Sequence, residues 1–456
     1  MTMAAERKAT VIVGAGPAGI RAAELLAAAG IRPLVIDEGL KAGGQVYRRA
    51  PQGFGRPAGQ LYGPEAGKAL ALHALFDRMV ARGEVEYYPQ SSAMALADNV
   101  LQALTPAGRR EFAYDRLILA TGATDRLVPL PGWQAPGVYS LGAMQIALKA
   151  QGVALGRRIV LAGSGPLLTL VAAQLLKAGA NVVAILDTAS LRNQILALPG
   201  MMARPSLVLR GLAMRLKLGR LYRAGVTLMD IVSDESGPGA VRWRDAGGCD
   251  HHTECDAVGI GWHLRAETQL AGLAQCSFDY DPGWAQWLPR ADRMGRCMEG
   301  IYLAGDSLRI LGADGAEVAG RLAASACLAD MGLPFPDPAR DLRLMARYER
   351  FARAVASAFP WPVDMIRSTP DHTMVCRCEG ISAGDIRRNV DYAGGEANRV
   401  KSMVRVGMGR CQGRFCQLAG AELIAEHAGT SVCDVGRLRE QAPARPLPIG
   451  SWINEA

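Results

Sequence analysis

Residues 10–38 read TVIVGAGPAGIRAAELLAAAGIRPLVIDE and contain every part of a dinucleotide-binding βαβ unit in the right order. The apolar run 10–13 predicts a short buried strand, and the alanine-rich segment that ends at Gly30 predicts a helix. A second apolar run, 33–36, predicts the next strand. Glycine turns alone are common and can be purely structural. The prediction of a nucleotide site therefore depends on the strand, turn, helix, second strand and acid occurring together.

The glycines of this unit have separate physical tasks. Gly14 makes the tight turn, Gly16 lets a pyrophosphate approach the backbone, and Gly19 lets the helix pack closely against the strand. The N-terminus of the helix offers partial positive charge to phosphates, and Asp37, 18 residues after Gly19, can accept hydrogen bonds from ribose hydroxyls. The nucleotide contacts expected from this segment are Gly14, Gly16, Pro17, Ala18, Gly19, Asp37 and Glu38.

Three further fragments indicate which nucleotide is bound. The strand-like run 117–120 closes on Thr121-Gly122, the run 301–304 closes on Gly305-Asp306, and Gly43-Gly44-Gln45 follows the second strand. These fragments resemble the flavoproteins with two dinucleotide-binding domains, a superfamily that includes thioredoxin and glutathione reductases. The resemblance covers most of residues 8–330 and implies FAD, with the aspartate binding its ribityl or phosphate portion. The implied contacts are Gly44, Gln45, Thr121, Gly122, Gly305 and Asp306.

A second βαβ unit begins at residues 158–162 and turns through GSGPLL at 163–168. The same resemblance implies a nicotinamide nucleotide at this turn. However, Leu168 stands where the third glycine is expected, and its side chain would push the helix from the strand and crowd the pyrophosphate path. We therefore expect a degraded NAD(P)-binding-like domain that keeps the scaffold, with NAD(P)H binding as the open alternative.

The positions of the cysteines exclude disulfide-reductase chemistry. No cysteine precedes Cys249, so neither place where this architecture carries a redox-active pair is occupied, and the thiolate is the reactive species. Cys249 and Cys255 flank His251 and His252, but the segment 255–260 reads better as a buried strand than as part of a metal site. Lone buried cysteines are also expected at Cys276, Cys297, Cys327 and Cys433.

Four cysteines near the C-terminus form a C-x-C pair and a C-x4-C pair separated by 32 residues. Thiols gathered this closely suit a soft metal or an iron–sulfur cluster. Structural zinc prefers a C-x2-4-C spacing and disulfides need an oxidising compartment, so these are the second and third alternatives. The candidate ligands are Cys376, Cys378, Cys411 and Cys416.

The cysteine spacing resembles the bacterioferritin-associated ferredoxin-like domain, a small helical module, and this resemblance implies a [2Fe-2S] cluster. Ser382, with Asp385 three residues later, predicts a helix N-cap, and an apolar helix is expected from Leu418 to about His427. Nearby arginines would offset the negative charge of a four-thiolate cluster, or else be solvated loop residues. They are Arg377, Arg410 and Arg414.

The composition fits a multidomain cytoplasmic protein. The 456 residues suffice for about three domains, and no apolar run is long enough to span a membrane. No cationic-then-apolar export segment precedes the first strand, and a net charge of +8 with 6% aromatic residues does not indicate nucleic-acid binding. The basic, leucine-containing stretch 204–223 is expected to be a solvated helix face, with a partner-subunit surface and then membrane contact as alternatives.

The expected fold class is α/β, with two Rossmann-like dinucleotide-binding domains of the glutathione/thioredoxin reductase type and a small helical [2Fe-2S] domain. Residues 1–125 and 268–335 would form a discontinuous FAD-binding domain, with 126–267 inserted between them. A helical connector over 336–370 would lead to the ferredoxin-like domain and its extended tail, 371–456.

The whole arrangement, including Gly43–Arg48 and the Arg445–Gly450 tail, resembles the α subunits of multi-subunit dehydrogenases such as opine oxidase, D-hydroxyproline dehydrogenase and hydrogen cyanide synthase. The resemblance implies an oxidoreductase whose chain transfers electrons during oxidation of an amino or imino acid of the hydroxyproline, proline or opine class. An FAD-dependent β subunit of the D-amino-acid-oxidase type would perform the substrate chemistry. Two further components stay open: a small ferredoxin-like γ subunit, and an additional FMN at an interface between subunits.

No acid–base pair or nucleophile for substrate chemistry is recognisable in the flavin domain, so we expect no catalytic residue in this chain. The histidines are scattered along the chain and do not indicate a catalytic or metal site. They are His73, His263, His372 and His427. The alternative function is a stand-alone NAD(P)H-dependent FAD/[2Fe-2S] reductase for a ferredoxin or oxygenase. A further alternative is an assembly scaffold whose nucleotide site does no redox work.

Overall fold

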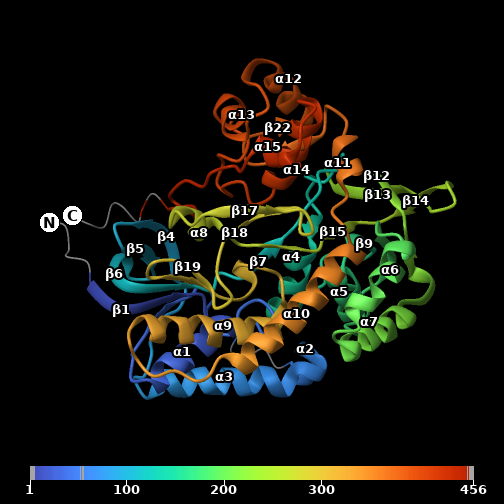
Figure 1. Ribbon diagram of the computed structural model, residues 1–456. Helices are drawn as coiled ribbons and strands as arrows, with labels where there is room; N and C mark the ends of the chain where they lie inside the picture. The colour runs from blue at the N-terminus through green and yellow to red at the C-terminus, as the bar shows by residue number, and fades with distance from the viewer. Residues whose placement is uncertain (1–5, 52, 54–55, 449, 451–456) are drawn as a thin grey trace.

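The predicted nucleotide-binding unit lies at the centre of an eight-stranded sheet (Figure 1). The computed structural model describes residues 6–51, 53, 56–448 and 450. The strands of the sheet are β1 (Glu6–Val13), β2 (Leu34–Ile36), β3 (Glu86–Tyr88), β4 (Ser92–Ala97), β5 (Val100–Thr105), β6 (Gly108–Leu119), β19 (Arg296–Met298) and β20 (Ile301–Leu303). Their order is β19-β20-β6-β1-β2-β3, with β5 on β6 and β4 on β5. Strands β2, β1, β6 and β20 are parallel, so their carboxyl ends meet at one edge.

Helices cover one face of this sheet because their apolar sides pack on the side chains that the strands direct to that face. These helices are α1 (Pro17–Ala28), α3 (Ala66–Ala81) and α9 (Gly312–Asp330). Ile12 and Val35 of the strands share their core with Leu26 and Phe76 of the helices. On the opposite face, the short α8 (Gln269–Leu273) contributes Leu270 to a second core.

The second βαβ unit belongs to a separate five-stranded parallel sheet with the order β11-β10-β9-β15-β8. Its strands are β8 (Val138–Ser140), β9 (Ile159–Ser164), β10 (Val182–Asp187), β11 (Tyr222–Ala224) and β15 (Ala257–Trp262). The helices α4 (Leu141–Ile146) and α5 (Pro166–Lys177) pack against it, and β12 (Thr227–Asp234), β13 (Gly237–Arg244) and β14 (Asp250–Glu254) form an antiparallel sheet beside it. The predicted buried strand over 255–260 is confirmed as β15, all six of whose residues are buried. The two βαβ sheets are linked by a ribbon of β7 (Ala123–Asp125) and β16 (Leu264–Ala266).

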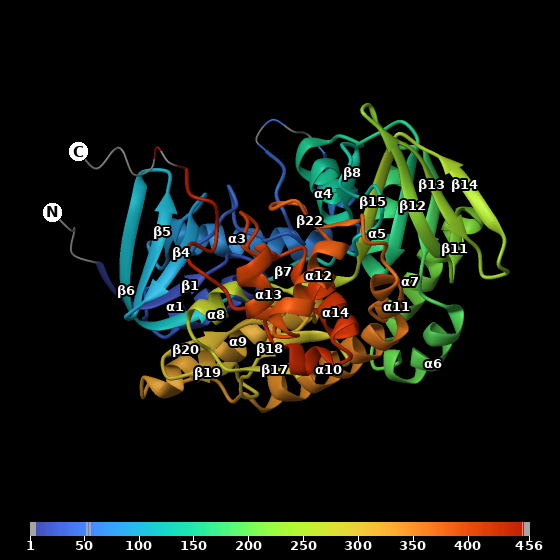
Figure 2. The same ribbon diagram turned by 90° about the horizontal axis from the view of Figure 1, so that it is seen from above.

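The cysteine-rich segment forms a helical unit that stands on β17 (Phe278–Asp281), β18 (Gln286–Pro289) and α8 (Figures 1 and 2). It is reached through α10 (Ala339–Ala358) and α11 (Val363–Arg367). The elements of the unit are β21 (Met374–Cys376), β22 (Ile381–Ser382), α12 (Ala383–Ala393), α13 (Ala397–Val404), α14 (Gln417–His427) and α15 (Val432–Val435). The predicted Ser382–Asp385 cap is confirmed as a reciprocal capping box, and α14 confirms the expected apolar helix. Of the tail motif 445–450, Ile449 lies outside the described residues.

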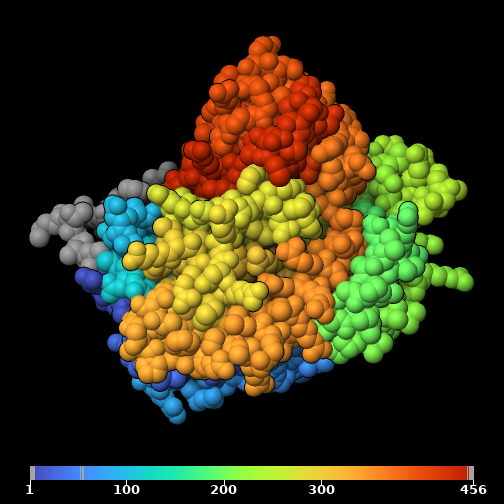
Figure 3. All heavy atoms as spheres, in the orientation of Figure 1, coloured from blue at the N-terminus to red at the C-terminus, as the bar shows by residue number. Residues whose placement is uncertain are grey.

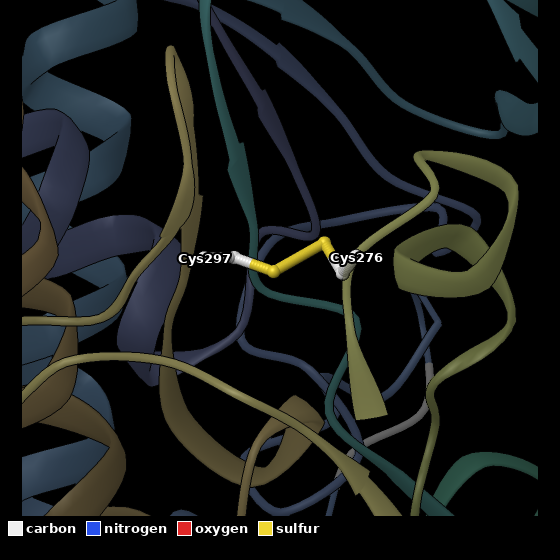
Figure 4. Close-up of a disulfide and its surroundings, with 2 residues drawn as sticks. All are labelled: Cys276 and Cys297. Atoms are coloured by element: carbon white, nitrogen blue, oxygen red, sulfur yellow. A yellow bond between two sulfur atoms is a disulfide. The ribbon is translucent and has the colours of Figure 1, made fainter. Parts of the chain in front are cut away.

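The expectation of lone buried cysteines was wrong at three positions. Cys276, which precedes β17, and Cys297, in β19, are joined in a disulfide, as Figure 4 shows. The fold brings their Cα atoms to 6.0 Å, within the usual range for such a bond. Cys433 is exposed rather than buried, whereas Cys255 and Cys327 are buried as expected.

The basic stretch forms a helix whose basic residues are only partly solvated: Lys217, Arg220 and Arg223 are exposed, as expected, whereas the other three are paired. It lies mainly in α7 (Pro205–Leu218), which follows α6 (Leu191–Met201) at the edge of the molecule (Figure 1). Arg204, Arg210 and Arg215 form ion pairs with carboxylates of other elements. The exposed positions of α7 are instead largely apolar, because pairing with those acids turns the arginines toward the protein. None of the helices in the described part of the chain is long and apolar enough to cross a membrane.

Candidate functional site

The carboxyl ends of the parallel strands border a cavity of about 1240 Å³. Its lining brings together the first glycine turn, the first turn of α5 in the second sheet, and the loop that carries Cys411. The volume exceeds the ~300–1,000 Å³ typical of a small-ligand pocket. The predicted contacts that line it are Gly14, Gly16, Pro17, Ala18, Asp37, Glu38, Gly44, Gln45, Thr121, Gly122 and Asp306.

The glycines at the strand ends make room for close backbone packing. Gly14 has φ +105°, and a Cβ placed on it would lie 2.3 Å from the carbonyl oxygen of Ala120. A Cβ on Gly19 would lie 1.8 Å from the carbonyl oxygen of Gly14. Gly19 and Gly305 are not part of the cavity wall, and a Cβ on Gly305 would lie 3.0 Å from that of Ala18. These two glycines therefore allow close packing behind the turn, on the side away from the cavity. A direct contact with the nucleotide stays a prediction.

Asp37 fixes the glycine turn through its carboxylate. Its Oδ2 accepts a hydrogen bond from the N–H of Ala15 (2.6 Å) and its Oδ1 accepts one from the N–H of Gly39 (2.6 Å). Burial raises the pKa of Asp37, while these two N–H groups lower it. Glu38 beside it pairs with Arg445 of the C-terminal tail at 2.5 Å. Both acids line the cavity, so the nucleotide end of this unit meets the tail.

Asp306 follows β20 at the same edge. Its Oδ1 accepts from the N–H groups of Leu311 (2.8 Å) and Gly312 (3.2 Å), and burial raises its pKa to about 6. Among the described residues, no hydrogen bond reaches its Oδ2, which leaves an acceptor at the cavity wall. The glycine cradle, this acceptor and the cavity volume fit FAD, which would supply hydride and one-electron chemistry.

In the second βαβ unit the first turn of α5 lines the cavity, but the acid at the end of β10 is sealed. Leu168 is fully buried in the core of the second sheet. Asp187, at the end of β10, is 1% exposed and accepts hydrogen bonds from the Tyr222 hydroxyl and the Ala189 N–H. Arg215 lies 3.6 Å from the same carboxylate. In this conformation Asp187 is not available to a ribose, and a degraded NAD(P) site stays a prediction.

The four C-terminal cysteines lie in two contacting pairs. The side chain of Cys376 meets that of Cys416, and the side chain of Cys378 meets that of Cys411. The hydrogen bond with Cys416 lowers the pKa of Cys376 to about 6, against the effect of burial. Backbone N–H groups contribute to the same shift; they belong to Gly407, Glu379 and Cys378.

This arrangement fits a two-iron cluster. None of the four cysteines is in a disulfide. Two thiol pairs supply the four ligands of a [2Fe-2S] cluster, which would add one-electron transfer. Gly409 makes the necessary room, because a Cβ on it would lie 2.3 Å from the Cβ of Cys378. Arg377 and Arg410 are exposed, as the solvated-loop alternative expected.

Arg414 is used differently, in a buried ion pair between the cysteine loop and the first sheet. Its Nε lies 2.7 Å from Glu267, and the two side chains are 10% and 7% exposed. The backbone of Glu267 is hydrogen-bonded to the predicted flavin contacts: its carbonyl accepts from the Thr121 hydroxyl (2.8 Å), and its N–H donates to the carbonyl of Gly122 (3.0 Å). Arg414 also donates to the carbonyl of Cys411 (3.2 Å).

Two neighbours of Glu267 bind the same loop. Arg265 donates to the carbonyl of Arg414 (3.0 Å) and to the Gln417 side chain (3.2 Å). Gln269 donates to the carbonyl of Gln412 (2.7 Å). Arg265, Glu267 and Gln269, which we call the clamp, are 2%, 6% and 3% exposed. The clamp thus fastens the cysteine loop to the strand end at which FAD is predicted.

Sequence reasoning missed the clamp and two other cavity residues. Alternate polar residues directly after the fully buried β15 were a signal that could have revealed the clamp. No pattern in the sequence pointed to Lys149. It is 7% exposed, and burial lowers its pKa to about 8. His263 also lines the cavity, with φ +65°, a conformation that a non-glycine residue adopts rarely.

Replacing Arg414 with alanine should destabilise the protein by about 3–5 kcal/mol, because the Glu267 carboxylate would stay buried after losing its closest partner. The exposed Arg405–Glu379 pair at 2.7 Å provides the control, and R405A should cost less than about 1 kcal/mol. Urea unfolding followed by circular dichroism measures both. Equal midpoints for the two variants would contradict the structural role of the clamp.

His263 should make the fold sensitive to acid. Burial first, and then the nearby Arg126, lowers the pKa of His263 from 6.5 to about 4. The unfolded chain therefore takes up this proton before the folded chain does, and stability falls as the pH drops from 6.5 toward 4. The loss from this one group should reach about 2 kcal/mol by pH 5.

The variant H263N isolates this effect, because asparagine does not titrate and tolerates the left-handed backbone. Urea midpoints should fall between pH 7 and pH 5 by a larger amount in the wild type than in H263N. Identical falls in the two proteins would show that His263 is not kept neutral by its surroundings.

Comparison with known proteins agrees with this geometry. Residues 8–320 match the model of the pyridine nucleotide-disulphide oxidoreductase family, and residues 374–426 match the BFD-like [2Fe-2S] binding domain. A subunit of opine oxidase from Rhizobium meliloti is 35% identical, over 96% of this chain and 86% of its own length. The HcnB subunit of hydrogen cyanide synthase from Pseudomonas protegens is 30% identical, over 97% of each chain.

The fold is shared with solved structures at lower identity. L-proline dehydrogenase from P. horikoshii aligns with a TM-score of 0.73 at 19% identity, over 98% of this chain and 80% of that protein. Thioredoxin reductase of T. acidophilum aligns with a TM-score of 0.51 at 18% identity, over 72% of this chain and 99% of that protein. The chain therefore belongs to the pyridine nucleotide-disulphide oxidoreductase family, as an oxidoreductase with an FAD-binding fold and a C-terminal BFD-like [2Fe-2S] domain.

Proposed function

We propose that this chain is the electron-transfer subunit of a heteromeric flavin and iron–sulfur dehydrogenase that oxidises an amino or imino acid of the hydroxyproline, proline or opine class. Relatives along nearly its whole length are named as subunits of opine oxidase and of hydrogen cyanide synthase, which supports an assembly of several chains. The proposal includes a D-amino-acid-oxidase-like flavoprotein as the partner that carries out the substrate chemistry. Further components to be sought are a small ferredoxin-like protein and an FMN between subunits.

The observation that carries the proposal is the shared cavity. The predicted flavin contacts Gly14, Thr121 and Asp306 line it together with Cys411, a candidate ligand of the cluster. The clamp residue Glu267 hydrogen-bonds to Thr121 and ion-pairs with the cysteine loop, so one buried connection joins the two predicted cofactor sites. An electron carrier needs two redox sites held at a fixed separation, and this geometry supplies it.

The acidic side chains of the cavity support a carrier rather than a site of amine oxidation. A general base that takes a proton from a substrate needs a free, correctly placed acceptor. Each carboxylate in the described lining already accepts a hydrogen bond or an ion pair from the protein, and the one oxygen left free, Oδ2 of Asp306, lies where the flavin is predicted. These carboxylates are Asp37, Glu38, Glu65, Asp125, Glu267, Asp306 and Asp314.

Anaerobic reduction of the purified chain tests the proposal. The flavin absorbance should stay unchanged after mixing with proline, hydroxyproline, octopine or glycine, and also after mixing with NADH or NADPH. One of the amines should bleach it once the flavoprotein that co-purifies with the chain from its native host is added. Fast bleaching by NAD(P)H alone would favour the stand-alone reductase, and bleaching by an amine alone would place the substrate chemistry in this chain. Absence of flavin from the purified protein would favour the scaffold.

A further inference from the structure

The helices α6 and α7 expose the side of each helix that usually faces a protein core. Large apolar side chains recur at helical spacing along both helices, and they are 41–74% exposed. On α6 and just beyond it they are Leu191, Ile195, Leu196, Leu198 and Met202, and on α7 they are Leu209, Leu212 and Leu216. We call these eight residues the docking face. Single exposed leucines are ordinary, but eight large apolar side chains exposed along two consecutive helices are more than scattered surface leucines account for.

The arginines of α7 do not cover this face, because they point the other way. Arg204 pairs with Asp314 and lies 4.6 Å from the centre of the Tyr348 ring. Arg210 pairs with Glu65 at 2.8 Å. A surface helix usually turns its apolar side to the core and its charged side to solvent. In α7 the arrangement is the opposite, because the arginines face the protein and the leucines face solvent.

The helices that carry the docking face have basic side chains but no acidic ones. No aspartate or glutamate occurs between Asp187, which is sealed in the interior, and Asp230. Four exposed cations on and around the two helices make no ion pair or hydrogen bond within the described residues: Arg192, Lys217, Arg220 and Arg223. A surface that complements this one is apolar at its centre and carboxylate-rich at its edge.

The same helix connects the docking face to the redox cavity. Arg204, Leu207 and Arg210 on the inner side of α7 line the cavity, whereas Leu209 and Leu212 lie on the outer side. A chain bound to the outer side would be separated from the cavity by about one helix diameter, ~10 Å. Figure 3 shows the green segment that contains α6 and α7 uncovered at the edge of the molecule.

We propose that the docking face binds the amine-oxidising flavoprotein subunit, through an apolar surface of that subunit that is edged by aspartate and glutamate. This inference rests on the proposed function, which requires a partner near the cavity. A second copy of this chain is disfavoured, because it would bring two sets of basic side chains together in a protein of net charge +8. A membrane is disfavoured because the face contains no tryptophan, tyrosine or phenylalanine, the residues typical of a membrane interface.

The test compares the triple variant L209Q/L212Q/L216Q with a matched control, L70Q/M298Q/M403Q, in the full-length holoprotein. The control positions are also exposed, at 52%, 44% and 62%, but lie on other elements. Each protein is mixed with the flavoprotein that co-purifies with the wild-type chain, and the Kd is measured by titration calorimetry. We expect the wild type and the control to bind alike and the α7 variant to bind at least about 100-fold more weakly, since buried apolar anchors dominate interfaces. Flavin and iron contents should be equal in all three.

Several results would overturn the proposal. The α7 variant could bind like the wild type, or the wild type could fail to bind the flavoprotein. Light scattering could show a dimer of the wild-type chain that the variant loses, which would assign the face to a second copy. Flotation with phosphatidylcholine–phosphatidylglycerol vesicles, lost in the variant, would assign it to a membrane. Binding is measured here without turnover, so a failure of the proposed redox function in the reduction assay would be recognised separately.

Discussion

Replacing Cys416 with alanine is expected to remove iron and labile sulfide from the protein while leaving flavin bound. Cys416 is 2% exposed and contacts Cys376, so its sulfur is one of the four candidate ligands and no other described cysteine can take its place. A [2Fe-2S] cluster needs four ligands, and three thiolates at this position would leave one iron open. Iron and sulfide assays, with the visible spectrum, measure the loss.

The matched control is C433A in the same unit. Cys433 is exposed in α15, outside the two contacting pairs, so this variant should keep full iron and sulfide. Retention of the cluster by C416A would contradict the ligand assignment. Loss of cluster from both variants would indicate general instability of the unit instead.

The second large effect is expected at Gly14. In the variant G14A the new Cβ would lie 2.3 Å from the Ala120 carbonyl oxygen, at a backbone angle of φ +105°. Strand β1 and the end of β6 would have to separate, so we expect the purified protein to lose most of its flavin and more than about 3 kcal/mol of stability. Flavin content after gel filtration and the urea midpoint measure the two effects.

G30A separates backbone strain from the steric clash. Gly30 also has a positive φ, +81°, but a Cβ on it meets nothing within 4 Å. This variant should therefore cost only the strain of a left-handed residue, about 1–2 kcal/mol, and retain flavin. If G14A and G30A behave alike, the close approach of the glycine turn to β6 is not what organises the site.

Local patterns predicted the individual elements well. The strand, turn, helix and strand at 10–38 and the capping box at Ser382 depend on neighbours within a few residues, and the structure confirms both. The same holds for α14, whose apolar pattern is continuous. Such features are encoded in spacing alone, so they can be read without knowing the tertiary structure.

Contacts between distant segments could not be predicted in this way. The clamp pairs Glu267 with Arg414, 147 residues apart, and the disulfide joins Cys276 to Cys297 across two strands. In both pairs, nothing in the sequence around one residue identifies the other residue as its partner. On α7, the spacing of leucines and arginines predicted a helix, but which side faces the protein depends on acids far away, such as Glu65 and Asp314. The helix was therefore predictable from its own residues, whereas its orientation was not.

The most direct test of the central claim, that one chain holds two connected redox sites, is flash photoreduction of the flavin in the purified holoprotein. We predict that the flavin absorbance recovers at the same rate at which the cluster absorbance bleaches, and that this rate is first-order and independent of protein concentration. The variant R414A, which removes the ion-pair partner of the clamp residue Glu267, should slow it. A rate that rises with protein concentration, or a cluster that stays oxidised while the flavin is reduced, would contradict the account.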